Sequence, residues 1–347
     1  MTAKKVCLIL VPLLVLLFMS SCAPRNDEKV QMNLRGSVFG TYYTITYFVE
    51  NGQDFQPQID SIFRAFNESL SYFVSHSLIT RINNNLTDTV DDLFRVVYLR
   101  SYEIFEATQG AFDPTVSPLV NAWGFGFAER MQLNPKLVDS LKGLVGLNRT
   151  QLQGNRIIKE DPRIQFDFNA IAKGYAADVI ARWLESKGVT SYLVELGGDL
   201  IVGDLKPDGT PWRIALEKPA EQYDDPQKWY LYVEMENEAV ATSGNYRRYY
   251  EVNGQRFSHT IDPASGYPVT HNLLSASVFA RDAITADAYA TAFMVMGFEN
   301  SKAFVENHPE LEAFFVYSTG LETYGTFATP GLTILEREDL KVNSSPK

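Results

Sequence analysis

Two short segments carry side chains that together could hold a divalent cation against a phosphate. The first, Asp167 to Tyr175, contains the pair Lys173-Gly174. The second contains Asp287 and Thr291, which are four residues apart and therefore project from one face of a predicted helix. Their carboxylate and hydroxyl oxygens are hard ligands suited to Mg²⁺. Neither segment is specific alone, because acidic residues near helix starts and solvated lysines are common.

His259 is a third candidate, since it ends a predicted strand and could act as a general base near neutral pH, although structural histidines are commoner. Gly197-Gly198 follows another strand and either admits a ligand close to the backbone or forms a turn. The chain contains no Gly-x-x-x-x-Gly-Lys loop, no Gly-x-Gly-x-x-Gly fingerprint and no Gly-x-Ser-x-Gly elbow. Four histidines without a thiol cluster also disfavour an ordinary zinc site.

The N-terminus has the pattern of a bacterial export signal. Two lysines precede an apolar run from Val6 to Met19, and small residues then lead into Cys22. The run is too short for a comfortable membrane span, and small residues before a cysteine resemble a lipobox. We therefore expect residues 1–21 to be a signal peptide, Cys22 to be lipidated and residues 22–33 to be a polar tether. An ordinary signal peptide or an uncleaved anchor is the alternative.

The lipobox interpretation predicts an exported protein anchored by lipid to a bacterial membrane, on the periplasmic side of the inner membrane. The mature domain would then have no free thiol, because the chain contains only two cysteines, Cys7 and Cys22. The formal net charge of -11 disfavours a nucleic-acid partner, so a phosphate ligand must be captured locally.

Periodicity indicates the elements that must position these residues. Helices are expected over about 59–73, 91–109, 134–146, 170–187 and 283–296, and strands over 37–49, 192–196, 199–204, 212–217, 229–235, 238–242 and 273–280. Asn253-Gly254 predicts a tight hairpin. Hairpins mixed with helices indicate an α+β fold. We expect mixed sheets with packed helices in a single large, two-lobed domain over 34–336, followed by a charged tail over 337–347.

With these motifs in view, the chain resembles the ApbE family of FAD:protein FMN transferases from about Phe39 to Gly297. The matching motifs occur in the family's order, and they are Phe39-Gly40-Thr41, Gly110-Ala111-Phe112-Asp113-Pro114-Thr115, Trp123-Gly124-Phe125-Gly126, Asp167 through Asp178, Leu196-Gly197-Gly198-Asp199, Thr242-Ser243-Gly244-Asn245-Tyr246, His259-Thr260-Ile261-Asp262-Pro263 and Ala286-Asp287-Ala288-Tyr289-Ala290-Thr291.

The resemblance implies an enzyme that uses Mg²⁺ to split its substrate FAD, joins FMN through its phosphate to a threonine or serine of a partner flavoprotein, and releases AMP. It implies that the metal ligands are Ala170, through its carbonyl, Asp287 and Thr291. It implies that His259 is the base that activates the acceptor hydroxyl and that Asp287 is also catalytic. The FAD contacts that it implies are Val38, Phe73, Ala111, Phe112, Asp113, Asp167, Lys173 and Ile261.

The expected acceptors are flavoprotein subunits of membrane electron-transport complexes. Two alternatives stay open, a Mg²⁺-dependent FAD pyrophosphatase that uses water as the acceptor and a non-catalytic FAD-binding lipoprotein. One departure from the family bears on this choice, because Leu70-Ser71-Tyr72-Phe73 stands where the family commonly has Met-Ser-x-Tyr. Phe73 keeps the aromatic ring of that tyrosine and lacks its hydroxyl, which puts in question a hydrogen bond and the balance between transfer and hydrolysis.

Overall fold

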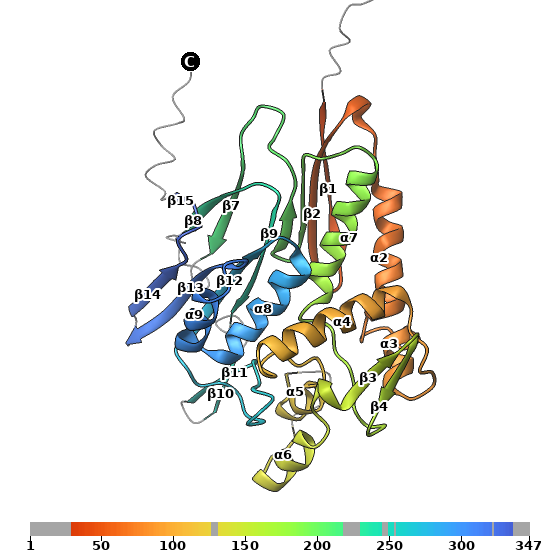
Figure 1. Cartoon of the computed structure of the whole chain (residues 1–347), viewed down its shortest axis with the longest axis vertical. Helices are drawn as coiled ribbons and strands as arrows, with labels where there is room; N and C mark the ends of the chain where they lie inside the picture. The colour runs from red at the N-terminus through yellow and green to blue at the C-terminus, as the bar shows by residue number, and fades with distance from the viewer. Residues whose placement is uncertain are drawn as a thin grey trace, which may run out of the picture.

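The computed structural model describes residues 29–125, 131–217, 230–244, 249–252, 255–320 and 323–335. An eight-stranded sheet with antiparallel neighbours throughout forms the centre of the fold, in the order β1-β2-β5-β6-β9-β12-β13-β14 (Figure 1). Its strands are β1 (Val30–Val38), β2 (Thr41–Val49), β5 (Tyr192–Leu196), β6 (Asp199–Val202), β9 (Glu238–Gly244), β12 (Leu273–Ala280), β13 (Glu312–Gly320) and β14 (Thr323–Ala328).

Three smaller sheets accompany the central one. In the first, β8 (Tyr230–Met235) lies between β7 (Trp212–Glu217) and β15 (Ile334–Leu335). The other two pair β3 (Thr150–Gln153) with β4 (Arg156–Lys159) and β10 (Tyr249–Val252) with β11 (Gln255–Ser258). The described helices are α2 (Gln56–Leu70), α3 (Leu78–Asn83), α4 (Asp92–Ala107), α5 (Ser117–Trp123), α6 (Pro135–Lys142), α7 (Ala172–Ser186), α8 (Ala283–Met296) and α9 (Phe298–Glu306).

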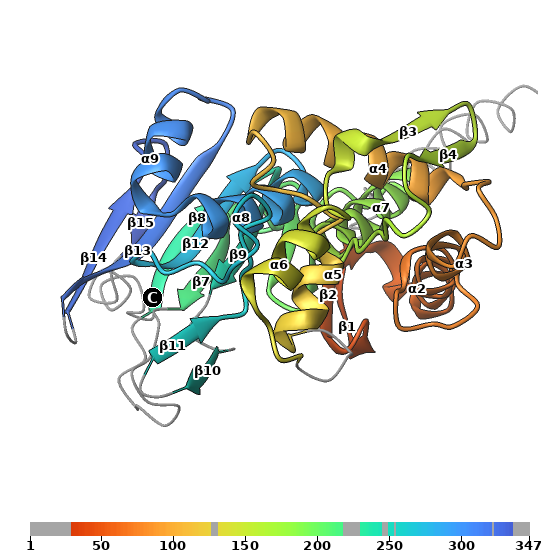
Figure 2. The same cartoon turned by 90° about the horizontal axis from the view of Figure 1, so that it is seen from below.

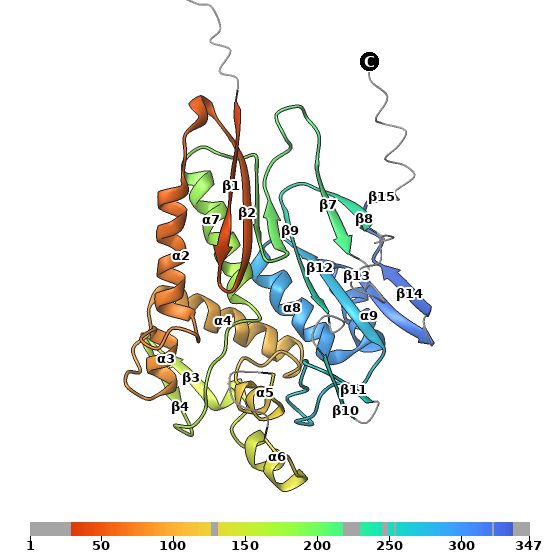
Figure 3. The same ribbon diagram turned by 180° about the vertical axis from the view of Figure 1, so that it is seen from behind.

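The two faces of the central sheet are covered differently. Side chains alternate between faces along a strand, so Ile201 and Ala239 lie in the main core with α7 and α8. Their neighbours Leu200 and Val240 join a second cluster with Trp212 and other residues of β7 and β8. Figure 3 shows the β7–β8 ribbon on the side of the sheet away from α8. The sheet is therefore buried on both faces at its centre.

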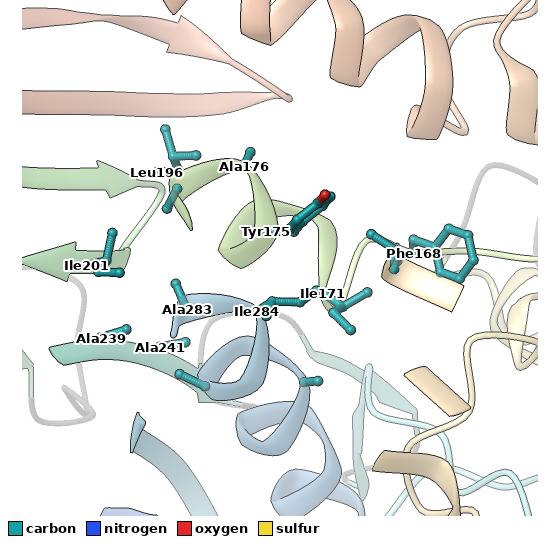
Figure 4. Packing of buried hydrophobic residues seen from close by; sticks show 14 of the residues in the cluster. Phe168, Ile171, Tyr175, Ala176, Leu196, Ile201, Ala239, Ala241, Ala283 and Ile284 are labelled. Carbon is teal, nitrogen blue, oxygen red and sulfur yellow. The ribbon is translucent and has the colours of Figure 1, made fainter. Parts of the chain in front are cut away.

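Small residues let α7 and α8 approach each other and the sheet closely. Figure 4 shows the start of α8 at Ala283 below α7, with Ala239 and Ala241 of β9 close to it. These three side chains, and that of Ala176 on the other side of α7, are fully buried. The close approach brings the first turns of the two helices together.

Helices α4, α5 and α6 lie at one end of the sheet (Figure 1). Helix α4 crosses beneath α2, α7 and α8, and α5 and α6 lie below it (Figure 1). Figure 2 shows α5 and α6 between the β10–β11 hairpin and α2. The main core is nevertheless one cluster of side chains, whose members come from along the chain between Leu34 and Phe315. The arrangement is therefore a single α+β domain, as expected.

Most of the predicted elements are confirmed to within a few residues, including α4, α7, α8, β7 and β12. Strands β10 and β11 pair as expected, and the predicted turn at Asn253-Gly254 lies outside the described residues. The single strand expected over 37–49 was wrong, because the chain reverses at Phe39-Gly40. Both residues have positive φ, 52° and 76°, as a two-residue type I′ hairpin turn requires. A Phe-Gly pair is not the usual signal for that turn.

Three boundaries also differ from the expectation. The fold was expected to start at residue 34 after a tether over 22–33, but β1 begins at Val30, which pairs with Val49. The helix expected to reach residue 146 ends at Lys142. Helix α2 ends at Leu70, so Phe73 lies in the following turn.

The proposed signal peptide, Cys22 and the charged tail lie outside the described residues. Within residues 29–335, wherever the structure gives a description, no helix combines the length and apolar character needed to cross a membrane.

Candidate active site

One lysine and two aspartates from three elements meet at the start of α7. Lys173 Nζ donates a hydrogen bond to Asp199 Oδ2 on β6, and it lies 3.4 Å from each carboxylate oxygen of Asp287 on α8. The carboxylate side chains are only 5% and 4% exposed, whereas the lysine side chain is 28% exposed. This lysine–aspartate cluster (Lys173, Asp199 and Asp287) is therefore buried on the carboxylate side and open to solvent through the lysine.

The glycine that follows Lys173 determines how closely α8 approaches. Gly174 lies in the first turn of α7, where main-chain amides have no partner within the helix. Its N–H donates to Asp287 Oδ2 at 3.0 Å. A Cβ atom at this position would lie 2.1 Å from Ala283 O and 2.9 Å from Asp287 Cβ. Only glycine therefore allows α7 to receive the Asp287 carboxylate at this distance.

Asp199 enters the cluster through a tight hairpin between β5 and β6. Gly197 and Gly198 have φ of 64° and 98°, and Leu196 pairs with Asp199 across the turn. The Gly-Gly pair therefore forms a two-residue type I′ turn. The sequence motif ended at Asp199, but no role was predicted for it. A carboxylate directly after a Gly-Gly hairpin was the available signal.

Burial and mutual charge set the electrostatics of the cluster. Burial, followed by the negative charge of Asp287, raises the pKa of Asp199 to about 7, and Lys173 opposes that rise. Burial lowers the pKa of Lys173, but the charges of Asp199 and Asp287 outweigh it and raise the pKa overall. Lys173 is thus held as a cation at neutral pH.

Oxygen donors continue from the cluster along α8. Thr291 lies one turn after Asp287, and its Oγ1 is 3.3 Å from Ser243 Oγ of β9. Ala170 lies in the turn just before α7, so its carbonyl belongs to the same segment as Lys173. Among the residues that the structure describes, no three His, Cys, Asp or Glu side chains are grouped to hold a metal. A cation here would therefore need hydroxyl or carbonyl oxygens beside Asp287, a donor set that suits Mg²⁺.

A main-chain hydrogen bond connects Asp167 to the loop that follows α4. Asp167 N–H donates to Pro114 O at 2.7 Å, and the Asp167 carboxylate accepts from Asn169 N–H at 2.9 Å. Burial raises the pKa of Asp167. These contacts place the 113–114 loop against the segment that leads into Lys173.

The side chains predicted on that loop point into the protein. Asp113 is buried and accepts hydrogen bonds from Thr115 N–H at 2.8 Å, Thr115 Oγ1 at 2.6 Å and Leu147 N–H at 3.3 Å. Its burial raises the pKa to about 6. Phe112 is 1% exposed within the main core, and Ala111 is half-buried. A ligand could therefore reach Phe112 only through its main chain.

His259 and Ile261 lie with α5 and α6. Ile261 packs with Leu119, Trp123 and Val138 in a small cluster separate from the main core. The half-buried His259 ring lies edge-on to Phe125, with centroids 6.4 Å apart. Trp123 Nε1 donates to the carbonyl of Gly266 at 2.9 Å, which braces the turn after Ile261.

Val38 and Phe73 differ sharply in exposure. Val38 is 9% exposed and lies at the edge of a surface hollow of about 500 Å³ beside α2. Phe73 is 64% exposed in the turn after α2. Of the predicted site residues, the structure thus joins Lys173 and Asp287 by direct contact and places Thr291 one turn further along α8, and the others lie on other segments.

Comparisons with known proteins agree with the family resemblance. The chain matches the model of the ApbE family over residues 39–315. It is 35% identical over 306 residues to the FAD:protein FMN transferase of Vibrio cholerae, covering 86% of this chain and 90% of that relative. It is 32% identical over 309 residues to the FAD:protein FMN transferase of Escherichia coli K12, covering 86% and 87%.

Solved structures give the same result. The flavin transferase ApbE from Vibrio cholerae superposes with a TM-score of 0.77 and 32% identity over 87% of this chain and 98% of that chain. The apo flavinyl transferase ApbE of Pseudomonas stutzeri gives a TM-score of 0.78 and 33% identity over 87% and 96%. This chain belongs to the ApbE family.

Proposed function

We propose that this member of the ApbE family is an FAD:protein FMN transferase, and that the lysine–aspartate cluster is its phosphoryl-transfer centre. The observation that carries the proposal is the convergence of Lys173, Asp287 and the first turn of α7. Phosphoryl transfer needs alignment and charge neutralisation more than covalent help from the protein. Here a lysine that is held as a cation lies beside a buried carboxylate, so a substrate phosphate can be both aligned and neutralised at this site.

The donor set at this place fits Mg²⁺, with Asp287, Thr291 and the Ala170 carbonyl as its ligands. Bound there, Mg²⁺ would neutralise charge on the pyrophosphate of FAD. Asp199 holds Lys173 by a direct hydrogen bond, while the ammonium lies 3.4 Å from Asp287. Lys173 is therefore oriented by one carboxylate and can contribute its charge to phosphate oxygens beside the other.

In the proposed transfer, an acceptor hydroxyl attacks the phosphorus of the FMN half of FAD. The new bond joins the acceptor oxygen to that phosphorus, and the bond to the bridging oxygen breaks so that AMP leaves. His259 takes the hydroxyl proton, which is the role of a general base. The product is a phosphoester between FMN and a threonine or serine of the acceptor.

Phe73 is the reason to consider a second candidate reaction, the hydrolysis of FAD to FMN and AMP. The exposed ring can stack on a flavin, but it lacks the hydroxyl of a tyrosine. Incubation with FAD and Mg²⁺, with and without an acceptor flavoprotein, separates the two reactions. Transfer predicts one covalent flavin on the acceptor for each AMP released, whereas AMP without covalent flavin would establish hydrolysis instead.

We further propose that the protein is exported and anchored by lipid at Cys22, on the periplasmic side of the inner membrane. The basis is the pattern of small residues before Cys22 after a short apolar run. Such a position would bring it to flavoprotein subunits of membrane electron-transport complexes. A Cys22→Ala variant should appear in the soluble fraction, and unchanged membrane association of that variant would contradict the anchor.

A further inference from the structure

A buried aspartate outside the lysine–aspartate cluster holds the start of α8. Asp178 lies on α7, one turn after Gly174, and is 1% exposed. Its two carboxylate oxygens accept hydrogen bonds from the first two amides of α8, Ala283 N–H at 2.7 Å and Ile284 N–H at 2.9 Å. First-turn amides have no partners inside their own helix, so Asp178 supplies partners from a different helix.

Helix α8 does not need Asp178 for an ordinary cap. Asp282 is its N-cap residue and accepts from Thr285 N–H at 3.1 Å, which is the usual local arrangement. Arg100 of α4 also donates to Thr285 Oγ1, at 2.6 Å. The contact made by Asp178 is therefore an addition that ties α8 to α7 rather than to itself.

Gly174 and Asp178 are four residues apart and share one face of α7. Asp178 holds the first turn of α8, and the Gly174 amide holds the Asp287 carboxylate one turn further along the same helix. The two helices are thus joined at two successive turns. Contacts at two turns fix both the position of α8 along its axis and its rotation about that axis.

Rotation matters because successive residues of a helix are about 100° apart. A small turn of α8 would move the Asp287 and Thr291 side chains together and take Asp287 away from Lys173. Burial, with a smaller contribution from the charge of Asp282, raises the pKa of Asp178 to about 7 despite the two hydrogen bonds.

We propose that Asp178 is a positioning residue that sets the register of α8 on α7, so that Asp287 and Thr291 present their oxygens together beside Lys173. The inference rests on the proposed magnesium-dependent function. It assigns to Asp178 no contact with substrate or metal.

The test compares Asp178→Asn with Asp282→Asn. The Asp178→Asn variant keeps the size of the side chain, but its amide nitrogen cannot accept from the second N–H of α8. The Asp282→Asn variant makes the same replacement of a carboxyl by an amide at the same helix start and keeps a good N-cap. Mg²⁺ affinity is measured by calorimetry well below the melting temperature, and hydrogen exchange of the Gly174 amide is followed in metal-free protein.

Asp178→Asn is expected to weaken Mg²⁺ binding about 10- to 100-fold, the range found for groups that orient metal ligands. It should also accelerate exchange of the Gly174 amide, while FAD affinity without Mg²⁺ stays the same. Asp282→Asn should change neither quantity by more than about twofold, since Asn replaces Asp well at an N-cap. Wild-type values for Asp178→Asn, or an equal loss in Asp282→Asn, would overturn the positioning role.

An Asp178→Ser variant, which can accept from one amide only, provides the same comparison if Asp178→Asn does not fold. The two readouts also separate this inference from the proposed function. Absence of Mg²⁺ binding in the wild-type protein would contradict the metal site. Exchange of the Gly174 amide would still decide whether Asp178 fixes the contact between α7 and α8.

Discussion

The main-chain amide of Gly174 donates a hydrogen bond to Asp287 Oδ2 at 3.0 Å, although the two residues are 113 positions apart in the chain. The contact satisfies an amide that α7 cannot satisfy itself, and it orients the only carboxylate among the three proposed metal ligands. Helix packing and metal binding therefore depend on the same pair of residues. A change at Gly174 should affect both.

Gly174→Ala should destabilise the protein by about 1–3 kcal/mol, the usual effect of overpacking. Alanine favours a helix by about 1 kcal/mol over glycine, but its Cβ would lie 2.1 Å from the carbonyl oxygen of Ala283, which cannot rotate away. Chemical denaturation measures the effect. Gly143→Ala, at a helix end with φ of -59°, is the control and should change stability by less than about 0.5 kcal/mol.

Phe73→Ala should weaken FAD binding by about 1–3 kcal/mol, because the ring is expected to contact the flavin. Fluorescence titration with FAD measures this loss. Phe73→Tyr restores the hydroxyl that the family commonly has, and it should shift the ratio of covalent flavin to free FMN toward transfer. An unchanged ratio and an unchanged affinity would mean that the missing hydroxyl has no functional effect.

His259→Ala should reduce transfer about 10²- to 10⁴-fold, the usual contribution of a positioned general base. FAD affinity should change little, because the base acts only when an acceptor hydroxyl arrives. Transfer rate, FAD affinity and melting temperature are measured on the same variant. A histidine that only braces its turn would instead lower all three together, and that result would remove the catalytic role.

Because of Glu238 of β9, the free energy of unfolding should fall as the pH rises. Burial, followed by the charge of Glu312, raises its pKa from 4.5 to about 7. The folded protein therefore holds this proton more tightly than the unfolded chain, so stability is lost between about pH 4.5 and 7. Glu238→Gln should raise the denaturation midpoint at pH 8 and leave it nearly unchanged at pH 4.5. The exposed Glu236→Gln is the control, and an equal gain in that variant would contradict the assignment.

The sequence predicted the individual elements better than their junctions. The alanine-rich helix α8, which Gly297 ends, and the apolar strand β12 were both located within a residue or two. The reversal at Phe39-Gly40 was missed, because the residues on both sides continue the same strand pattern through a turn without Asn or Asp. Short elements such as α3 and β4 were not predicted, since four to six residues carry little periodicity.

The candidate site could be predicted from the sequence only in part, for a related reason. Lys173, Asp287 and Thr291 were predicted from motif and spacing, and the structure brings the first two into contact. The roles of Asp199 and Asp178 depend on which helix faces which strand, and that information is absent from local patterns. The inward orientation of Phe112 and Asp113 likewise follows from packing rather than from the motif that contains them.

The role of Asp287 in Mg²⁺-dependent cleavage of FAD is tested most directly by AMP release in Asp287→Ala. Both wild type and variant are assayed over a range of Mg²⁺ concentrations, with circular dichroism to confirm that the variant is folded. We expect Mg²⁺-dependent AMP release in the wild type and none above background in the folded variant, because Asp287 supplies the charged ligand. Full Mg²⁺-dependent AMP release by Asp287→Ala would remove Asp287 from the proposed metal site.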